Sequence, residues 1–111
     1  MENIPYNNVY VMLVDDDNSM LQTTTILLEE EGYKVIAYNS GKEAIDKFND
    51  TVFVVILDIT MPEMSGLEVF EIIKSKNQYI PIIFHTGLDQ KEKRTDIRKH
   101  FRPHAYVVKG S

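Results

Sequence analysis

The chain has no cysteine among its 111 residues. This absence excludes disulfides, thiolate metal sites and cysteine nucleophiles, and it agrees with a cytoplasmic location. The sequence also has no run of about 18 apolar residues, so no membrane-spanning helix is expected. Its first residues, Met1–Pro5, lack the basic and then apolar pattern of a signal peptide. We therefore expect one cytoplasmic domain, because a chain of this length fits a single hydrophobic core.

Positive charge is scarce as well. Twelve lysines and arginines are set against 17 aspartates and glutamates, which gives a formal net charge of −5. Phosphate repulsion makes such an acidic domain a poor binder of nucleic acid, so we expect no direct nucleic-acid partner. Several basic residues nevertheless gather in one C-terminal segment, which is more typical of a solvated helix face than of a docking patch. They are Lys91, Lys93, Arg94, Arg98, Lys99 and Arg102.

Apolar runs alternate with helix-like segments along the whole chain, a pattern typical of βαβ units around a parallel sheet. The first and third runs are apolar on both faces, as buried central strands are. Right-handed crossovers place helices on both sides of such a sheet. The sequence predicts an α/β, flavodoxin-like, doubly wound fold with strand order 2-1-3-4-5. The five predicted strands are Tyr10–Val14, Lys34–Tyr38, Val52–Leu57, Ile80–Phe84 and Ala105–Val108.

Four helices are predicted between these strands. The first three begin at capping boxes, in which Ser19, Ser40 and Ser65 are each followed three residues later by Gln or Glu. The first helix is expected to end at Gly32, a residue type suited to the turn after a helix. The fourth helix opens near Asp89 and is very polar.

The strand ends carry the residues of chemical interest. In a parallel sheet the carboxyl ends of the strands share one edge, where open α/β folds bind ligands. Carboxylates there suit Mg²⁺ or Ca²⁺, and a carboxylate can also attack phosphorus to give an aspartyl phosphate. A lysine would offset charge on the phosphoryl oxygens, and a threonine hydroxyl could hydrogen-bond to one of them. The strand-end residues are Asp15, Asp16, Asp58, Thr86 and Lys109.

Four stretches of the sequence resemble, in the same order, the receiver domain of two-component response regulators, the single-domain chemotaxis type included. Each stretch is weak alone, but together they are highly specific and are spread over most of the chain. They are Leu13-Val14-Asp15-Asp16-Asp17, Asp58-Ile59-Thr60-Met61-Pro62-Glu63-Met64-Ser65-Gly66, Pro81-Ile82-Ile83-Phe84-His85-Thr86-Gly87 and Ala105-Tyr106-Val107-Val108-Lys109.

The resemblance implies a role for the acidic residues. Asp58 would be the phosphoacceptor, taking a phosphoryl group from the phosphohistidine of a sensor histidine kinase or of a phosphotransfer protein. Asp15 and Asp16 would hold Mg²⁺ together with Asp58 and the main-chain carbonyl of Thr60. The domain would be a signalling switch with slow self-catalysed phosphorylation and dephosphorylation rather than a turnover enzyme.

The resemblance also implies how the switch would act. Lys109 would pair with the phosphoryl group, and Thr86 and Tyr106 would respond to it. Their response would change the affinity of the domain for partners, including a downstream effector domain or protein. Leu88, two residues after Thr86, would border the attacking water and shield the acyl phosphate, so we expect slow hydrolysis.

The sequence departs from that family in two places. The family usually has proline after the lysine, often with a cis bond, whereas this chain has Gly110. The family also has a fifth helix, so residues 1–111 read as one receiver domain that is truncated at its C-terminus. The face of the last two strands would then be open, and we expect a homodimer through that face or marginal stability. The final Gly110-Ser111 suits a natural linker and an added tail equally well.

Two other functions stay open. An aspartyl-phosphate phosphohydrolase would carry a second acid two residues after its nucleophile, where this chain has Thr60. An unphosphorylated, receiver-like interaction module would lack the acceptor or the acid pair, and both are present here. Among the remaining residues, Asp17 suits a turn or a water-mediated metal contact. His85 is expected to point away from the site, because side chains alternate along a strand.

Overall fold

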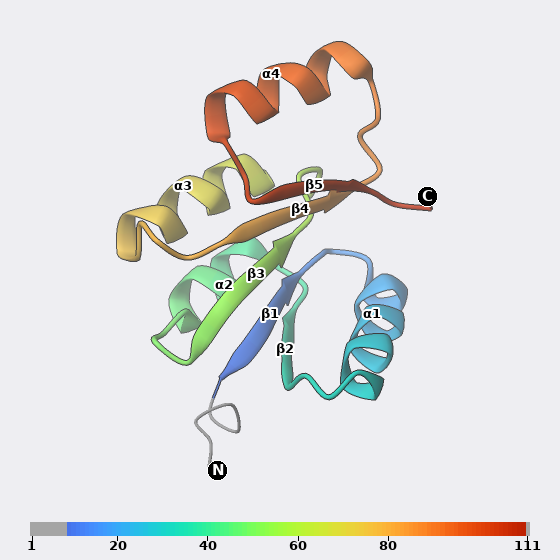
Figure 1. The fold of residues 1–111 in the computed structure, drawn as a ribbon, viewed down its shortest axis with the longest axis vertical. Helices are drawn as coiled ribbons and strands as arrows, with labels where there is room; N and C mark the ends of the chain where they lie inside the picture. The colour runs from blue at the N-terminus through green and yellow to red at the C-terminus, as the bar shows by residue number, and fades with distance from the viewer. Residues whose placement is uncertain (1–8, 111) are drawn as a thin grey trace.

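A computed structural model describes residues 9–110 of the chain, so the expectations on Met1–Pro5 and on Ser111 concern residues outside this range. Within it, five strands alternate with four helices (Figure 1). The strands are β1 (Tyr10–Val14), β2 (Val35–Tyr38), β3 (Val52–Leu57), β4 (Ile82–Thr86) and β5 (Ala105–Val108). The helices are α1 (Asn18–Glu30), α2 (Gly41–Lys47), α3 (Gly66–Lys76) and α4 (Lys91–Phe101).

The strands form one parallel sheet in the order β2-β1-β3-β4-β5, which confirms the predicted doubly wound fold. The register brings the carboxyl ends of neighbouring strands level with one another. Val14 at the end of β1 lies beside Tyr38 of β2 and Leu57 of β3. The residues that follow these strands therefore meet at one edge of the sheet.

Two of the three predicted helix starts are confirmed by their caps. The Ser40 hydroxyl accepts a hydrogen bond from the Glu43 N–H at 3.1 Å, and α2 begins at the next residue. The Ser65 hydroxyl accepts from the Leu67 N–H at 3.1 Å and caps α3. Each serine supplies an acceptor for an N–H group that has no partner within the first turn of its helix.

The predicted start of the first helix near Ser19 is confirmed to within one residue, but Ser19 as its cap is wrong. Helix α1 begins at Asn18, and its N-cap is Asp17, whose carboxylate accepts a hydrogen bond from the Met20 N–H at 3.2 Å. Aspartate caps a helix as well as serine does, and here it comes first along the chain. The predicted end is confirmed, since Gly32 follows the helix with φ of 96°, in the left-handed region.

The fourth strand lies two residues later than predicted, at Ile82–Thr86 rather than Ile80–Phe84. The Ile80 N–H bonds to the Asn77 carbonyl at 3.3 Å inside the preceding turn, and Pro81 has no N–H to offer a neighbouring strand. The ladder therefore starts after the proline. As a consequence Thr86 is the last residue of the strand.

Two smaller boundaries also differ. The second strand starts at Val35 rather than Lys34, and the last helix starts at Lys91 rather than at Asp89. Asp89 instead forms an ion pair with Arg94 ahead of the first turn. Neither difference moves a candidate site residue.

The two faces of the sheet are covered unequally (Figure 1). On one face α2, α3 and α4 pack over a large apolar cluster whose members include Leu57 and Phe84. On the other face α1 packs over a small cluster made of Val11, Leu13 and Leu21. No helix in the described range is long and apolar enough to cross a membrane.

Candidate functional site at the carboxyl edge of the sheet

Two strands place the central carboxylates. The Asp58 N–H donates to the Val14 carbonyl at 2.9 Å, which holds the end of β3 against the end of β1. The Asp15 N–H donates to the Tyr38 carbonyl at 3.2 Å, which does the same between β1 and β2. Each aspartate is therefore fixed by its own main chain at the point where its strand ends.

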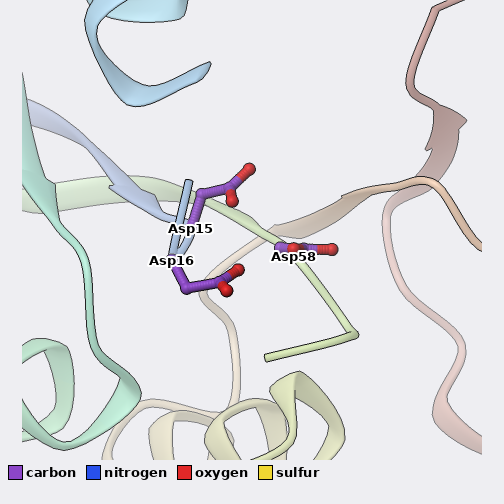
Figure 2. Close-up of side chains that lie close together, drawn as sticks. All are labelled: Asp15, Asp16 and Asp58. Atoms are coloured by element: carbon purple, nitrogen blue, oxygen red, sulfur yellow. The ribbon is translucent and has the colours of Figure 1, made fainter. Parts of the chain in front are cut away.

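The three predicted acidic residues come together at this edge. Asp15, Asp16 and Asp58 each offer a carboxylate oxygen, and these oxygens all lie within 4.8 Å of one another. Figure 2 shows the three carboxyl groups directed to the same side of the strand ends. Asp15 and Asp58 are only 5% and 4% exposed, whereas Asp16 is exposed. The cluster is thus open to solvent on the side of Asp16 and closed behind it.

Lys109, which follows β5, supplies the counter-charge. Its Nζ lies 2.8 Å from an Asp15 carboxylate oxygen and 3.3 Å from one of Asp58. Its main-chain N–H donates to the Thr86 carbonyl at 2.8 Å. Burial opposes the charged ammonium, but the hydrogen bonds and charges of the two aspartates outweigh it and raise the pKa of Lys109. The lysine is therefore held as a cation between the two buried carboxylates.

Asp58 has a polar environment built for an ionised or modified carboxyl group. The Thr60 N–H donates to one of its oxygens at 3.3 Å, and the nearby Thr86 hydroxyl favours its ionised form. Burial nevertheless raises the pKa of Asp58, and the charge of Asp15 adds to this effect, although Thr86 and Lys109 act in the opposite direction. One lysine does not offset three carboxylates, so the pocket favours a further positive charge.

The two candidate switch residues are linked through one loop residue. Thr86 is fully buried, and its hydroxyl accepts a hydrogen bond from the Leu88 N–H at 3.3 Å. The Tyr106 hydroxyl donates to the Leu88 carbonyl at 2.6 Å. Leu88 therefore holds both side chains through its main chain. No residue type signals this contact in the sequence, because any residue at position 88 carries the same two main-chain groups.

Two further residues differ from their sequence-based interpretation. Asp17 caps α1, and its N–H donates to an Asp15 carboxylate oxygen at 2.9 Å, so it supports the cluster through its main chain. His85 does lie on the opposite face from Thr86, but it is not remote from the acids. It lines a small cavity of about 10 Å³ together with Asp15 and Asp58. Burial and the charge of Lys109 lower the pKa of His85.

The donor set fits a hard divalent cation. Its three oxygens are carboxylate oxygens, and the described residues place no sulfur or imidazole ligand among them. The formal charge of three carboxylates and one ammonium is −2, which a divalent ion would neutralise. Asp16 leaves the cluster open to solvent, so an ion can enter with part of its water shell, as Mg²⁺ prefers.

The fold and the site define an α/β domain with an acidic cluster and a lysine at the carboxyl edge of a doubly wound sheet. The family model of the response regulator receiver domain matches residues 11–109. The chain therefore belongs to the response regulator receiver domain family. It is also 34% identical over 82 residues to the response regulator SaeR of Staphylococcus aureus. That match covers 74% of this chain and 36% of SaeR, so the chain spans about a third of this longer relative.

Solved structures agree with this assignment. The chemotaxis protein CheY4 of Vibrio cholerae is 29% identical, with a TM-score of 0.82 over 93% of this chain and 88% of CheY4. The response regulator protein TrrA of Thermotoga maritima, solved in complex with Mg(2+)-BeF, is 35% identical. Its TM-score is 0.80 over 92% of this chain and 87% of TrrA.

Proposed function

We propose that this domain is a phosphorylation-dependent signalling switch in which Asp58 accepts a phosphoryl group from a phosphohistidine. The donor would be a sensor histidine kinase or a phosphotransfer protein, and the reaction would take place in the cytoplasm. The observation that carries the proposal is the position of Asp58, a buried strand-end carboxylate. Its carboxylate lies beside those of Asp15 and Asp16 and within reach of the ammonium of Lys109.

The chemistry follows from these positions. A carboxylate oxygen of Asp58 attacks the phosphorus, the P–N bond to the donor imidazole breaks, and its electron pair stays on the imidazole nitrogen. Lys109 offsets negative charge on the phosphoryl oxygens as the bond forms. Asp15 and Asp16, with Asp58 and the Thr60 carbonyl, would hold Mg²⁺. When bound, this ion supplies further charge neutralisation at the phosphoryl oxygens. The relative TrrA, solved with Mg(2+)-BeF, supports this choice of ion.

The output would pass through the hydroxyl groups near Asp58. A phosphoryl group on Asp58 would offer new acceptors to the Thr86 hydroxyl, which lies near the carboxyl group. Thr86 shares Leu88 with Tyr106, so a shift of the threonine alters the loop that holds the tyrosine. The surface around Tyr106 would then change its affinity for an effector domain or protein. Phosphorylation and hydrolysis in the absence of a partner would be slow.

The residues of the same site argue against two alternative functions. A phosphohydrolase with an aspartyl-phosphate intermediate needs an acid to protonate the leaving group, and Thr60 at that position has none. An interaction module that is never phosphorylated would not need a buried acceptor with a counter-charged lysine. We rank both below the switch.

The test is labelling with acetyl phosphate, followed by mass spectrometry of the intact chain. We expect a mass gain of one phosphoryl group that requires Mg²⁺ and is absent in Asp58→Asn. Asp50→Asn, at an exposed aspartate just before the start of β3 and so at the opposite end of that strand from Asp58, is the control and should label normally. Full labelling of Asp58→Asn would refute the assignment. Rapid turnover of a phosphomonoester would support the hydrolase, and a wild-type chain that never labels would support the interaction module.

A further inference from the structure

The loop between β3 and α3 contains a strained turn. The Met64 N–H donates to the Pro62 carbonyl at 2.7 Å, and Glu63 between them has φ of 70°. A hydrogen bond across three residues with a positive φ at the middle one defines the rarer form of the γ-turn, which is strained. Glutamate lacks the short polar side chain that eases this cost in asparagine. Glu63 therefore holds a backbone conformation that its own residue type opposes.

The two ends of this loop are fixed beside the acceptor. The Gly66 N–H donates to the Ile59 carbonyl at 2.8 Å, and the Ser65 hydroxyl donates to the same carbonyl at 3.5 Å. The approach is so close that a Cβ atom added to Gly66 would overlap the Asp58 carbonyl oxygen. Residues 60–65 therefore form a closed loop whose start and end are tied together.

The middle of the loop is held by the packing of its methionines. Met61 and Met64 are partly buried and pack against the large apolar cluster. Both lie beside Gly41 of α2, where an added Cβ atom would be 3.4 Å from the Met64 sulfur and 3.7 Å from the Met61 methyl group. The Glu63 side chain, in contrast, is exposed, and within residues 9–110 it makes no hydrogen bond or ion pair. The neighbours of Glu63 thus keep it in the left-handed region, and its own carboxylate does not.

Thr60, whose carbonyl is the main-chain ligand of the proposed Mg²⁺ site, lies in the same closed loop. If Glu63 relaxed to a negative φ, the loop could close only through compensating rotations at other residues. Pro62 cannot supply a rotation about φ, because its ring fixes that angle. On the other side of the turn, the hydroxyl of Ser65 is bonded to the first turn of α3. The compensating rotations therefore fall on Thr60 and Met61, and they turn the Thr60 carbonyl.

We propose that Glu63 is a positioning residue for Mg²⁺ that acts through the backbone of this loop. The inference rests on the metal site of the proposed function. In the metal-free chain the loop exchanges between the strained turn, which presents the Thr60 carbonyl to the ion, and a relaxed path, which turns it away. The ion binds the strained path, so part of its binding free energy is used to hold Glu63 in the left-handed region. The residue at position 63 thereby sets the Mg²⁺ concentration at which Asp58 can be phosphorylated.

The experiment is a Mg²⁺ titration of the 111-residue chain and its variants, followed by the nuclear magnetic resonance signals of the main-chain amides. Glu63→Ala removes the carboxylate and keeps the backbone cost, whereas Glu63→Gly removes both. We expect Glu63→Gly to bind Mg²⁺ about tenfold more tightly than Glu63→Ala, with Glu63→Asn between them. The dissociation constant compares folded states only, so the greater freedom of glycine in the unfolded chain does not affect it. Dispersed amide signals verify that each variant is folded.

Arg102 provides a matched control, because it is the other non-glycine residue with a positive φ, 51°, in the described range. It follows α4 and precedes β5, so it lies at the opposite edge of the sheet from the acids. Arg102→Gly and Arg102→Ala should bind Mg²⁺ equally.

The outcomes separate this proposal from the proposed function. Equal Mg²⁺ affinity of Glu63→Gly and Glu63→Ala would overturn the proposal even if their melting temperatures differ, because the turn would then be structural alone. An equal gain in affinity for Arg102→Gly over Arg102→Ala would overturn it too. A wild-type chain that binds no Mg²⁺ would overturn both the proposal and the metal site. If the affinity series holds but acetyl phosphate never labels Asp58, the proposed function fails and the role of Glu63 stands.

Discussion

The two faces of the sheet show how differently one set of strands can be stabilised. The face under α2, α3 and α4 is closed, and its side chains, such as Phe84 and Val55, are fully buried. The face under α1 holds a small cluster and leaves Val107 and Phe53 partly in water. Because strand residues alternate between the faces, neighbours in sequence experience opposite environments. The closed face therefore carries most of the apolar stabilisation of the described residues.

The largest expected effect is on the free energy of unfolding, when one side chain is truncated on the closed face and, in a separate variant, one on the open face. Phe84 is fully buried and packs against Phe70 and Tyr106, with ring centroids at 5.3 and 6.2 Å. Phe84→Ala should lower the free energy of unfolding by about 3–5 kcal/mol. The adjacent Ile83 faces the other side and is half-buried, so Ile83→Ala should cost less than about 2 kcal/mol. Urea unfolding measures both values, and equal losses would contradict the contrast between the faces.

The next effect concerns the edge where both faces end. Lys109 contacts Asp15 and Asp58 directly, whereas His85 lines the cavity beside them from the open face. Lys109→Ala should slow acetyl-phosphate labelling by roughly 10²–10³-fold, because one counter-charge to the phosphoryl oxygens is lost. His85→Ala is the matched comparison and should slow it far less. The labelling rates of both variants are measured by mass spectrometry. A comparable loss of rate in the two variants would mean that the open face takes part in the chemistry.

A smaller effect is expected at Leu88, which packs against the closed-face cluster. In the proposed switch its apolar side chain borders the acyl phosphate and offers no hydrogen bond to an attacking water. Leu88→Gln should therefore speed the loss of the phosphoryl group, by up to about tenfold, the change produced by ~1.4 kcal/mol in the barrier. The decay of the labelled mass over time measures this rate. An unchanged rate would show that Leu88 does not shield the site.

The smallest effect is on stability and depends on pH. Burial raises the pKa of Asp58, so the folded chain binds this proton more readily than the unfolded chain does. Stability therefore falls as the pH rises through the folded pKa, and a neutral residue avoids this loss. Without Mg²⁺, Asp58→Asn should melt at a higher temperature than the wild type at pH 7. The difference should shrink as the pH falls toward the ordinary carboxyl range of about 4. A lower melting temperature for the variant at pH 7 would contradict this prediction.

The fold and the acidic cluster could be predicted from the sequence because both depend on local residue patterns. A buried strand appears in the sequence as an apolar run. The residue that follows the run lies at the carboxyl edge of the sheet, whichever strands pair beside it. The displaced β4 shows where this reasoning fails. The run from Ile80 is apolar, but Pro81 and the turn at Asn77 delay the ladder. Capping failed in a similar way at Ser19, where Asp17 offered a cap of equal quality earlier in the chain.

Contacts made by main-chain groups could not be predicted from the sequence. The link from Tyr106 through the Leu88 carbonyl depends on the path of a loop, and loop geometry is not encoded in residue type there. The position of His85 shows a related limit. Alternation correctly assigned it to the face opposite Thr86, but a strand end is narrow enough for both faces to border the same carboxylates.

Lys109 contacts the ends of several strands. Its side chain reaches the ends of β1 and β3, and its main chain is bonded to the end of β4, while it directly follows β5. Four of the five strands are thus tied at one residue. In the proposed switch, a change of charge on Asp58 would act directly on this lysine, which the ends of β4 and β5 also hold. This contact would couple the acceptor to β4 and β5 directly, in addition to the proposed route through Thr86 and Leu88 to Tyr106.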